Sequence, residues 1–106
     1  MAQEISLLYI TVRDTEEARR IGRALVERRL VACVNIIDRI GSLYWWEGKI
    51  AEENEVLIIA KTKSSLAPEV IAAVKSLHSY SCPCIVALPI IDGNADFLSW
   101  VARETR

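Results

Sequence analysis

The feature that most constrains the fold is a long run of strand-forming residues that doubles back on itself. A largely apolar segment from Val31 to Trp46 is followed by Glu47-Gly48-Lys49, and a second run continues from Ile50 to Lys61. This pattern predicts one β-hairpin. Sixteen extended residues reach roughly 50 Å at about 3.3 Å per residue. A compact chain of about 100 residues is only roughly 33 Å across, so the hairpin must bend sharply or project beyond the body.

The tip of this hairpin carries three consecutive aromatic residues, Tyr44, Trp45 and Trp46. Adjacent strand residues point to opposite faces, so the two tryptophans cannot share one side. A projecting arm would therefore expose apolar surface on both faces, and another subunit is the simplest cover. Gly41 predicts a bulge or bend in the first arm. The polar run from Glu52 to Glu55 predicts the point where the return arm leaves the body.

The other segments complete a single α+β domain over residues 1–106. Asp14 and Glu17 resemble a capping box at the start of a helix. The order β-α-β-β-α-β-α predicts a split βαβ, ferredoxin-like arrangement with a C-terminal helix. Besides the hairpin, the expected elements are a strand at 4–12, a helix from Asp14 to about Leu30, a helix opened by Ser64-Ser65 and Pro68, a strand at 85–91 and a helix at 95–104.

Composition limits the classes of partner and compartment. The net charge is −1 and the bases form no stripe, which disfavours nucleic-acid binding. No apolar run approaches the roughly 18 residues of a membrane span, and the N-terminus lacks the basic region of a signal peptide. Three cysteines, an odd count, then predict a cytoplasmic protein with reduced thiols.

The residues best suited to metal chemistry follow the second helix. His78, the only histidine, precedes Cys82 and Cys84 in a His-x3-Cys-x-Cys spacing. Imidazole and thiolate suit ions such as Cu(I) and Zn(II), although the second ligand pair of specific zinc motifs is missing. The alternative is structural, because a histidine at a helix C-terminus is favoured by the helix dipole.

Three residues of the hairpin base have open roles. Cys33 is expected to be a small apolar residue of a buried strand, and Asn35 needs hydrogen-bond partners if it is buried. Lys61 is either a solvated strand end or part of an anion site beside the next helix. An enzyme using Cys33 or His78 is the least favoured class, because no base and orienting group can be paired with them.

Taken together, these residues resemble the CutA family of divalent-cation tolerance proteins. The Tyr-Trp-Trp-Glu-Gly block is the most specific part of the resemblance, which extends from about Tyr9 to Trp100. The matching stretches are Ala32-Cys33-Val34-Asn35, Ser42-Leu43-Tyr44-Trp45-Trp46-Glu47-Gly48-Lys49, Glu55 with Lys61-Thr62, His78 with Tyr80 and Pro83, Pro89-Ile90, and Gly93-Asn94 with Phe97-Leu98-Ser99-Trp100.

The resemblance implies a ferredoxin-like, PII-like fold and a homotrimer in which long hairpins extend sheets across subunits. It implies a non-enzymatic protein that binds divalent metals, copper above all, and needs no cofactor for folding. The trimer interface is then expected at Tyr44, Trp45, Trp46 and Trp100.

The resemblance also implies metal ligands, a strand cysteine and the histidine of a His-Pro-Tyr-Glu-like motif, which fall on Cys33 and His78. This chain reads His78-Ser79-Tyr80-Ser81 instead, so the proline and the glutamate are both replaced. Cys82 and Cys84, if they face the site, would shift its metal preference toward copper or zinc. The alternative function is a PII-like signalling or scaffold protein that binds a small anionic ligand in an inter-subunit cleft lined by Asn35, Lys61 and Tyr80.

Overall fold

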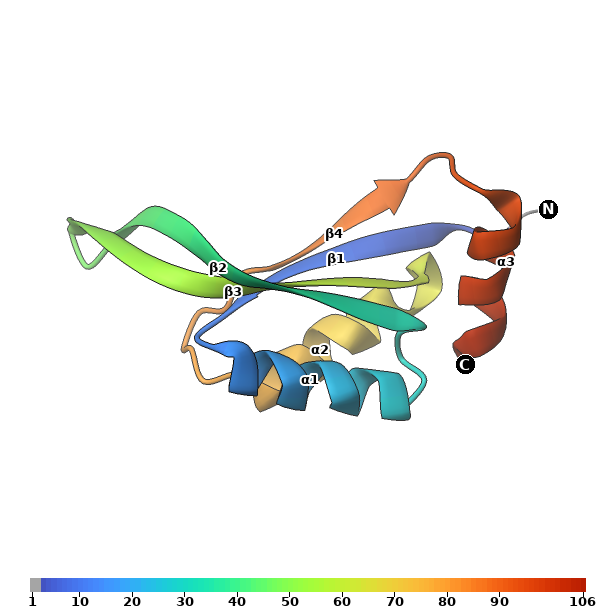
Figure 1. The fold of residues 1–106 in the computed structure, drawn as a ribbon, viewed down its shortest axis with the longest axis horizontal. Coiled ribbons are helices and arrows are strands. Elements are labelled where there is room, and N and C mark those ends of the chain that lie inside the picture. Colours follow the sequence, from blue (N-terminus) through green and yellow to red (C-terminus); the bar gives the residue numbers. More distant parts are fainter. Residues whose placement is uncertain (1–2) are drawn as a thin grey trace.

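The computed structural model describes residues 3–106 as a four-stranded antiparallel sheet with three α-helices (Figure 1). The strands lie side by side in the order β2-β3-β1-β4. The elements in chain order are β1 (Ile5–Val12), α1 (Thr15–Glu27), β2 (Cys33–Trp46), β3 (Lys49–Lys63), a short 3-10 helix η1 (Ser64–Leu66), α2 (Ala67–Leu77), β4 (Ile85–Ile90) and α3 (Ala95–Glu104). The predicted β-α-β-β-α-β-α order is confirmed.

The hydrophobic core lies between one face of the sheet and the helices α1 and α2 (Figure 1). Alternate residues of a strand share a face, so β1 and β3 each contribute every second side chain to this core. The helices contribute the apolar stripes that their 3.6-residue period predicts. Residues with no measurable exposure in this core are Leu8, Ile10, Val12, Ala18, Ile21, Leu25, Ile58, Ala60, Val70 and Val74.

The β2–β3 hairpin projects beyond the body, as its length predicts. β1 pairs with β3 only from Val56 to Lys63, whereas residues 49–55 pair with β2 alone. The molecule therefore measures 47 × 25 × 22 Å along its principal axes. Glu47 and Gly48 form a two-residue turn with φ values of 50° and 77°, and turns with two positive φ values match the twist of paired strands.

The irregularity in the first arm is not at Gly41, and that prediction is wrong. Gly41 pairs with Asn54 in regular register. The register shifts instead between Ile37 and Ile40, where β2 carries one residue more than β3 and Arg39 adopts a φ of 65°. A bulge needs an unpaired residue and a local backbone twist, which a non-glycine residue supplies here.

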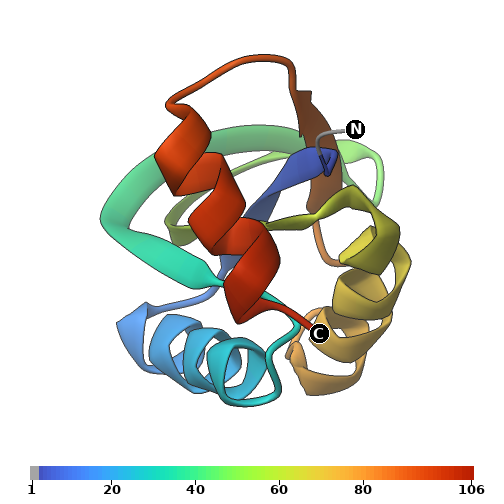
Figure 2. The ribbon, with the colours of Figure 1, turned by 90° about the vertical axis from the view of Figure 1, so that its right-hand side faces the viewer.

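The sheet face opposite the core carries no helix over most of its length (Figure 1). The helix α3 instead packs across the end of the sheet where β1 begins (Figure 2). Val101 of α3 is fully buried, and Glu104 accepts a 2.8 Å hydrogen bond from Arg29. Apolar side chains on the open face include Ile37, Val86 and Leu88, which are 45%, 48% and 47% exposed.

None of the helices within residues 3–106 is long and apolar enough to cross a membrane.

Candidate functional site

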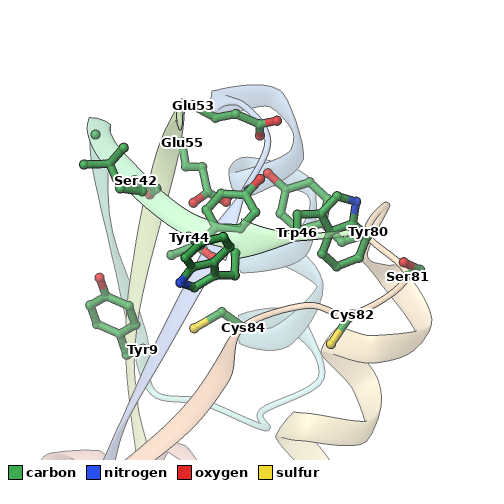
Figure 3. A pocket seen from close by; sticks show the side chains of 14 residues that line it. Tyr9, Ser42, Tyr44, Trp46, Glu53, Glu55, Tyr80, Ser81, Cys82 and Cys84 are labelled. Carbon is green, nitrogen blue, oxygen red and sulfur yellow. Dashed lines mark hydrogen bonds between the residues drawn. The ribbon is translucent and has the colours of Figure 1, made fainter. Parts of the chain in front are cut away.

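A cleft of about 770 Å³ lies between the projecting hairpin, the end of β1 and the loop that joins α2 to β4 (Figure 3). This volume is within the range of small-molecule sites. Aromatic rings, two carboxylates and two thiols face one another across it. The lining residues are Tyr9, Thr11, Gly41, Ser42, Leu43, Tyr44, Trp45, Trp46, Glu53, Glu55, Tyr80, Ser81, Cys82 and Cys84.

The strand period sets which hairpin side chains reach the cleft. Glu53 and Glu55 are two residues apart on β3, so they share a face of the ribbon. Ser42 lies directly opposite Glu53 in the pairing register. Tyr44 follows two residues after Ser42 on the same face, so aromatic and acidic groups come together at this part of the hairpin.

A hydrogen bond links the loop to the hairpin across the cleft. The Tyr80 hydroxyl donates to Glu55 Oε2 at 3.0 Å, and Glu55 is only 7% exposed. Burial and the neighbouring carboxylate raise the pKa of Tyr80 well above its usual value, so the phenol stays protonated and remains a donor. Burial and Glu53 raise the pKa of Tyr44 in the same direction.

His78 is held between two backbone groups. Its Nε2 lies 2.7 Å from the Thr11 carbonyl oxygen, and its Nδ1 accepts a 3.1 Å hydrogen bond from the Tyr80 N–H. A carbonyl can only accept, so Nε2 carries the proton and Nδ1 provides the lone pair. Both ring nitrogens are therefore engaged, and His78 could ligate a metal only after giving up one of these bonds.

Glu17 also holds the loop between α2 and β4 in place. The sequence predicted only its role in the capping box of α1, not this contact. Glu17 is 1% exposed, and its side chain accepts 2.9 Å hydrogen bonds from the N–H groups of Arg13 and Ser79. Burial acts to raise the pKa of Glu17, but these hydrogen bonds lower it below its usual value. Asp14, meanwhile, caps α1 by accepting from the Glu17 N–H at 2.8 Å.

Ser79 occupies the place of the proline expected from the resemblance. A proline has no N–H, so it could not make the bond that Ser79 donates to Glu17. The departure from the expected motif thus adds a contact between the loop and the start of α1.

The structure gathers only some of the predicted site residues. Tyr80, Cys82 and Cys84 all line the cleft, and both cysteines are exposed free thiols. Within residues 3–106, no group of three or more His, Cys, Asp or Glu side chains is placed to hold a metal ion. The predicted metal ligands therefore do not converge within one subunit.

The predicted residues at the base of the hairpin lie away from the cleft. Cys33 is the first residue of β2 and pairs with Lys61 of β3, and neither lines the cleft. The Lys61 ammonium donates a hydrogen bond to Asn35, which is exposed and not buried. Asn35 and Lys61 therefore do not share the cleft with Tyr80 in the single chain.

Three of the four aromatic residues predicted at a subunit interface are exposed in the single chain, and the fourth, Trp100, is half-buried. Trp45 is 73%, Trp46 47% and Tyr44 37% exposed at the hairpin tip. Trp100 is part of α3 and packs on Phe97, with ring centroids 5.7 Å apart. Trp100 thus lies at the other end of the molecule from the tip.

Comparison with known proteins agrees with this architecture. The family model for the CutA1 divalent ion tolerance protein matches residues 6–104. The chain belongs to the CutA family. It is 46% identical over 99 residues to the divalent-cation tolerance protein CutA of Thermus thermophilus, which covers 93% of this chain and 96% of the relative.

The mouse protein CutA is 45% identical over 101 residues. That match covers 95% of this chain but 57% of the mouse protein, so the chain spans a little over half the length of this relative. Among solved structures, CutA1 from Oryza sativa superposes with a TM-score of 0.96 at 39% identity, covering 99% of this chain and 96% of that one. The CutA1 structure from Thermus thermophilus superposes with a TM-score of 0.93 at 44% identity, covering 96% and 99%.

Proposed function

We propose that this protein is a non-enzymatic, homotrimeric divalent-cation tolerance protein of the cytoplasm. We propose that it binds metal ions and prefers copper. Membership of the CutA family supports a role in tolerance of divalent cations. The strand order β2-β3-β1-β4, with α1 and α2 on one face, supports a ferredoxin-like, PII-like fold.

The trimer is supported by apolar surface that the single chain leaves uncovered. The open sheet face presents Ile37, Val86 and Leu88, and the projecting tip presents Trp45 and Trp46. Exposed apolar groups on two adjoining surfaces are typical of an interaction site. Hairpins that reach onto neighbouring subunits would cover both surfaces at once.

The metal site is proposed to centre on Cys82 and Cys84, the two exposed thiols that line the cleft. Thiolates prefer soft ions such as Cu(I). Cys33, as a further ligand, would come from another subunit. His78 would join only after releasing Thr11 or Tyr80, to which both of its nitrogens are bonded.

Native mass spectrometry tests assembly and metal binding together. We expect a mass of three subunits and saturable uptake of Cu(I) that exceeds uptake of Cu(II) and Zn(II). The double variant Cys82→Ser/Cys84→Ser should lose Cu(I), whereas Cys33→Ser, which removes only the further ligand, should weaken Cu(I) binding. Unchanged Cu(I) affinity in the double variant would refute the thiol-centred site, and a monomeric mass would refute the trimer.

The second candidate function is PII-like binding of a small anion, favoured by the half-buried Lys61 and the exposed Asn35 that it bonds on the open face. Because ligands of the native state raise its stability, a thermal shift screen separates the two functions. Stabilisation by nucleotides or carboxylates, without any by metals, would favour anion binding.

A further inference from the structure

A groove of about 550 Å³ lies between the outer side of α1 and the base of β2, which pack beside each other (Figure 1). The apolar residues of its lining are Gly22, Val26, Val34 and Ile36. Val34 packs against the core beneath the helices, and Ile36, two residues later on the strand, shares its side of the sheet. The groove is therefore on the helix side, opposite the open face that the proposed trimer covers. It shares no lining residue with the cleft beneath the hairpin.

The floor of this groove forms where the helix comes closest to the strand. A Cβ added at Gly22 would lie 3.0 Å from Val34 Cγ2, so only glycine lets the two elements approach this far. Val26 of the helix and Ile36 of the strand are 39% and 36% exposed. These residues offer only aliphatic side-chain surface, so the body of a ligand held here would be apolar.

The outer rim of the groove carries Arg19, Arg23 and Glu27. They are four residues apart, so they share one side of α1. Within residues 3–106, Arg19 forms no salt bridge. Arg23 pairs with Glu27 at 3.5 Å, but the two side chains are 79% and 64% exposed, and ion pairs of that kind are weak. Arg23 can therefore leave Glu27 for a stronger partner.

The two arginines favour an anion between them. Like charges four residues apart repel each other along a helix, and an anion beside both would relieve that repulsion. A guanidinium group binds a carboxylate through two parallel hydrogen bonds. Glu27 lies roughly 12 Å along the helix from Arg19, so the Arg19 end of the groove suits the anion best. A second anionic group at the Glu27 end would be repelled, which favours a ligand with a single charge.

We propose that this groove binds a small aliphatic monocarboxylate, with its carboxylate between Arg19 and Arg23 and its hydrocarbon chain against Val26, Val34 and Ile36. The single anionic head matches the two arginines, and the aliphatic surface offers no side-chain partner to further polar groups. Because the groove is on the helix side of the sheet, binding is compatible with a trimer built through the open face.

The experiment is a calorimetric titration of the wild-type protein with sodium hexanoate at constant ionic strength. Sodium acetate carries the anionic head without the chain, and n-hexanol carries the chain without the charge. Each should bind at least about tenfold more weakly than hexanoate, because two buried methylene groups or one charge-assisted hydrogen bond account for about that factor.

Substitutions place the ligand in the groove. Arg19→Gln should weaken hexanoate binding about tenfold, the loss expected for one charge-assisted hydrogen bond, and Val26→Ser should weaken it by removing contact with the chain. Arg28→Gln is the matched control, because Arg28 is an exposed arginine at the end of α1 that does not line the groove. It should change binding less than about twofold, since salt screens charges at that distance. Native mass spectrometry verifies that each variant assembles as the wild type does.

Three results would overturn the proposal. The first is the absence of saturable hexanoate binding to the wild type, and the second is n-hexanol binding as tightly as hexanoate. The third is equal weakening by Arg19→Gln and Arg28→Gln, which would show a general effect of charge. Amide NMR shifts should centre on Gly22 and Val26, which distinguishes this groove from the anion site considered at Lys61. Cu(I) uptake measured on the same samples reports the proposed metal function independently.

Discussion

Replacing Glu17 by glutamine should destabilise the protein and weaken its dependence on pH. Glu17 is buried and accepts hydrogen bonds of 2.9 Å from the N–H groups of Arg13 and Ser79. These two donors belong to the end of β1 and to the loop before β4. Glu17 and Ser79 are 62 residues apart in sequence, so this one carboxylate joins distant segments of the chain.

The magnitude follows from the two oxygen acceptors. A hydrogen bond to a charged group contributes about 1.5–3 kcal/mol net. Glutamine keeps one oxygen but turns an amide NH2 toward the other donor, so one such bond is lost. The ion pair of Glu17 with the half-exposed Arg20, at 3.5 Å, adds at most about 1 kcal/mol. We expect Glu17→Gln to lower the free energy of unfolding by about 2–4 kcal/mol at pH 7.

The sign of the pH effect follows from the lowered pKa of Glu17 in the folded state. A carboxyl group with a lowered folded pKa contributes stability above its unfolded pKa, about 4.3. That contribution is lost as the pH falls through the folded value. The difference between wild type and Glu17→Gln should therefore be full at pH 7 and shrink progressively below about pH 4.

Urea unfolding followed by circular dichroism measures both quantities, with protein concentration held fixed because assembly adds to apparent stability. Glu16→Gln, an exposed neighbour in the same helical turn, is the control and should change stability by less than about 0.5 kcal/mol. A loss below about 1 kcal/mol for Glu17→Gln, or a loss that is the same at pH 3 and pH 7, would refute this account of the carboxylate.

Three further predictions, one of them with a control substitution, address the hairpin and the cleft. Trp46→Ala should raise the concentration at which subunits dissociate more than it lowers core stability, and a variant that stays trimeric at low micromolar concentration and after heating would contradict this. Gly48→Ala should cost about 1–2 kcal/mol because Gly48 has a φ of 77°. Gly41→Ala, with open space around the new Cβ, should lower the stability less than Gly48→Ala does. Thermal melts of the two variants measure this difference. Tyr80→Phe should cost about 1–3 kcal/mol by removing the donor to buried Glu55, which chemical denaturation measures.

The order and type of elements could be predicted because each rests on a local pattern. Apolar periodicity marks strands and helices, and the capping role of Asp14 is encoded within four residues. The overhang of the hairpin also follows from length alone, since an extended strand cannot be compressed.

The position of the bulge and the contacts of the loop were not predictable in the same way. Gly41 looked like the irregular residue, but the extra residue lies between Ile37 and Ile40, since register depends on how both strands pair. A single histidine near two cysteines suggested a ligand. Which groups occupy the ring nitrogens of His78 depends on Thr11, 67 residues away.

The sequence by itself therefore determined the elements, the projecting hairpin and, through the Tyr-Trp-Trp-Glu-Gly block, the family. Only the tertiary structure decided that Glu17 supports the loop and that Tyr80 reaches Glu55. It also decided that the cleft is acidic and holds no basic side chain. The physical reason is that periodicity and capping act between near neighbours in the chain. Burial and hydrogen bonding between distant segments depend instead on how the packed elements meet.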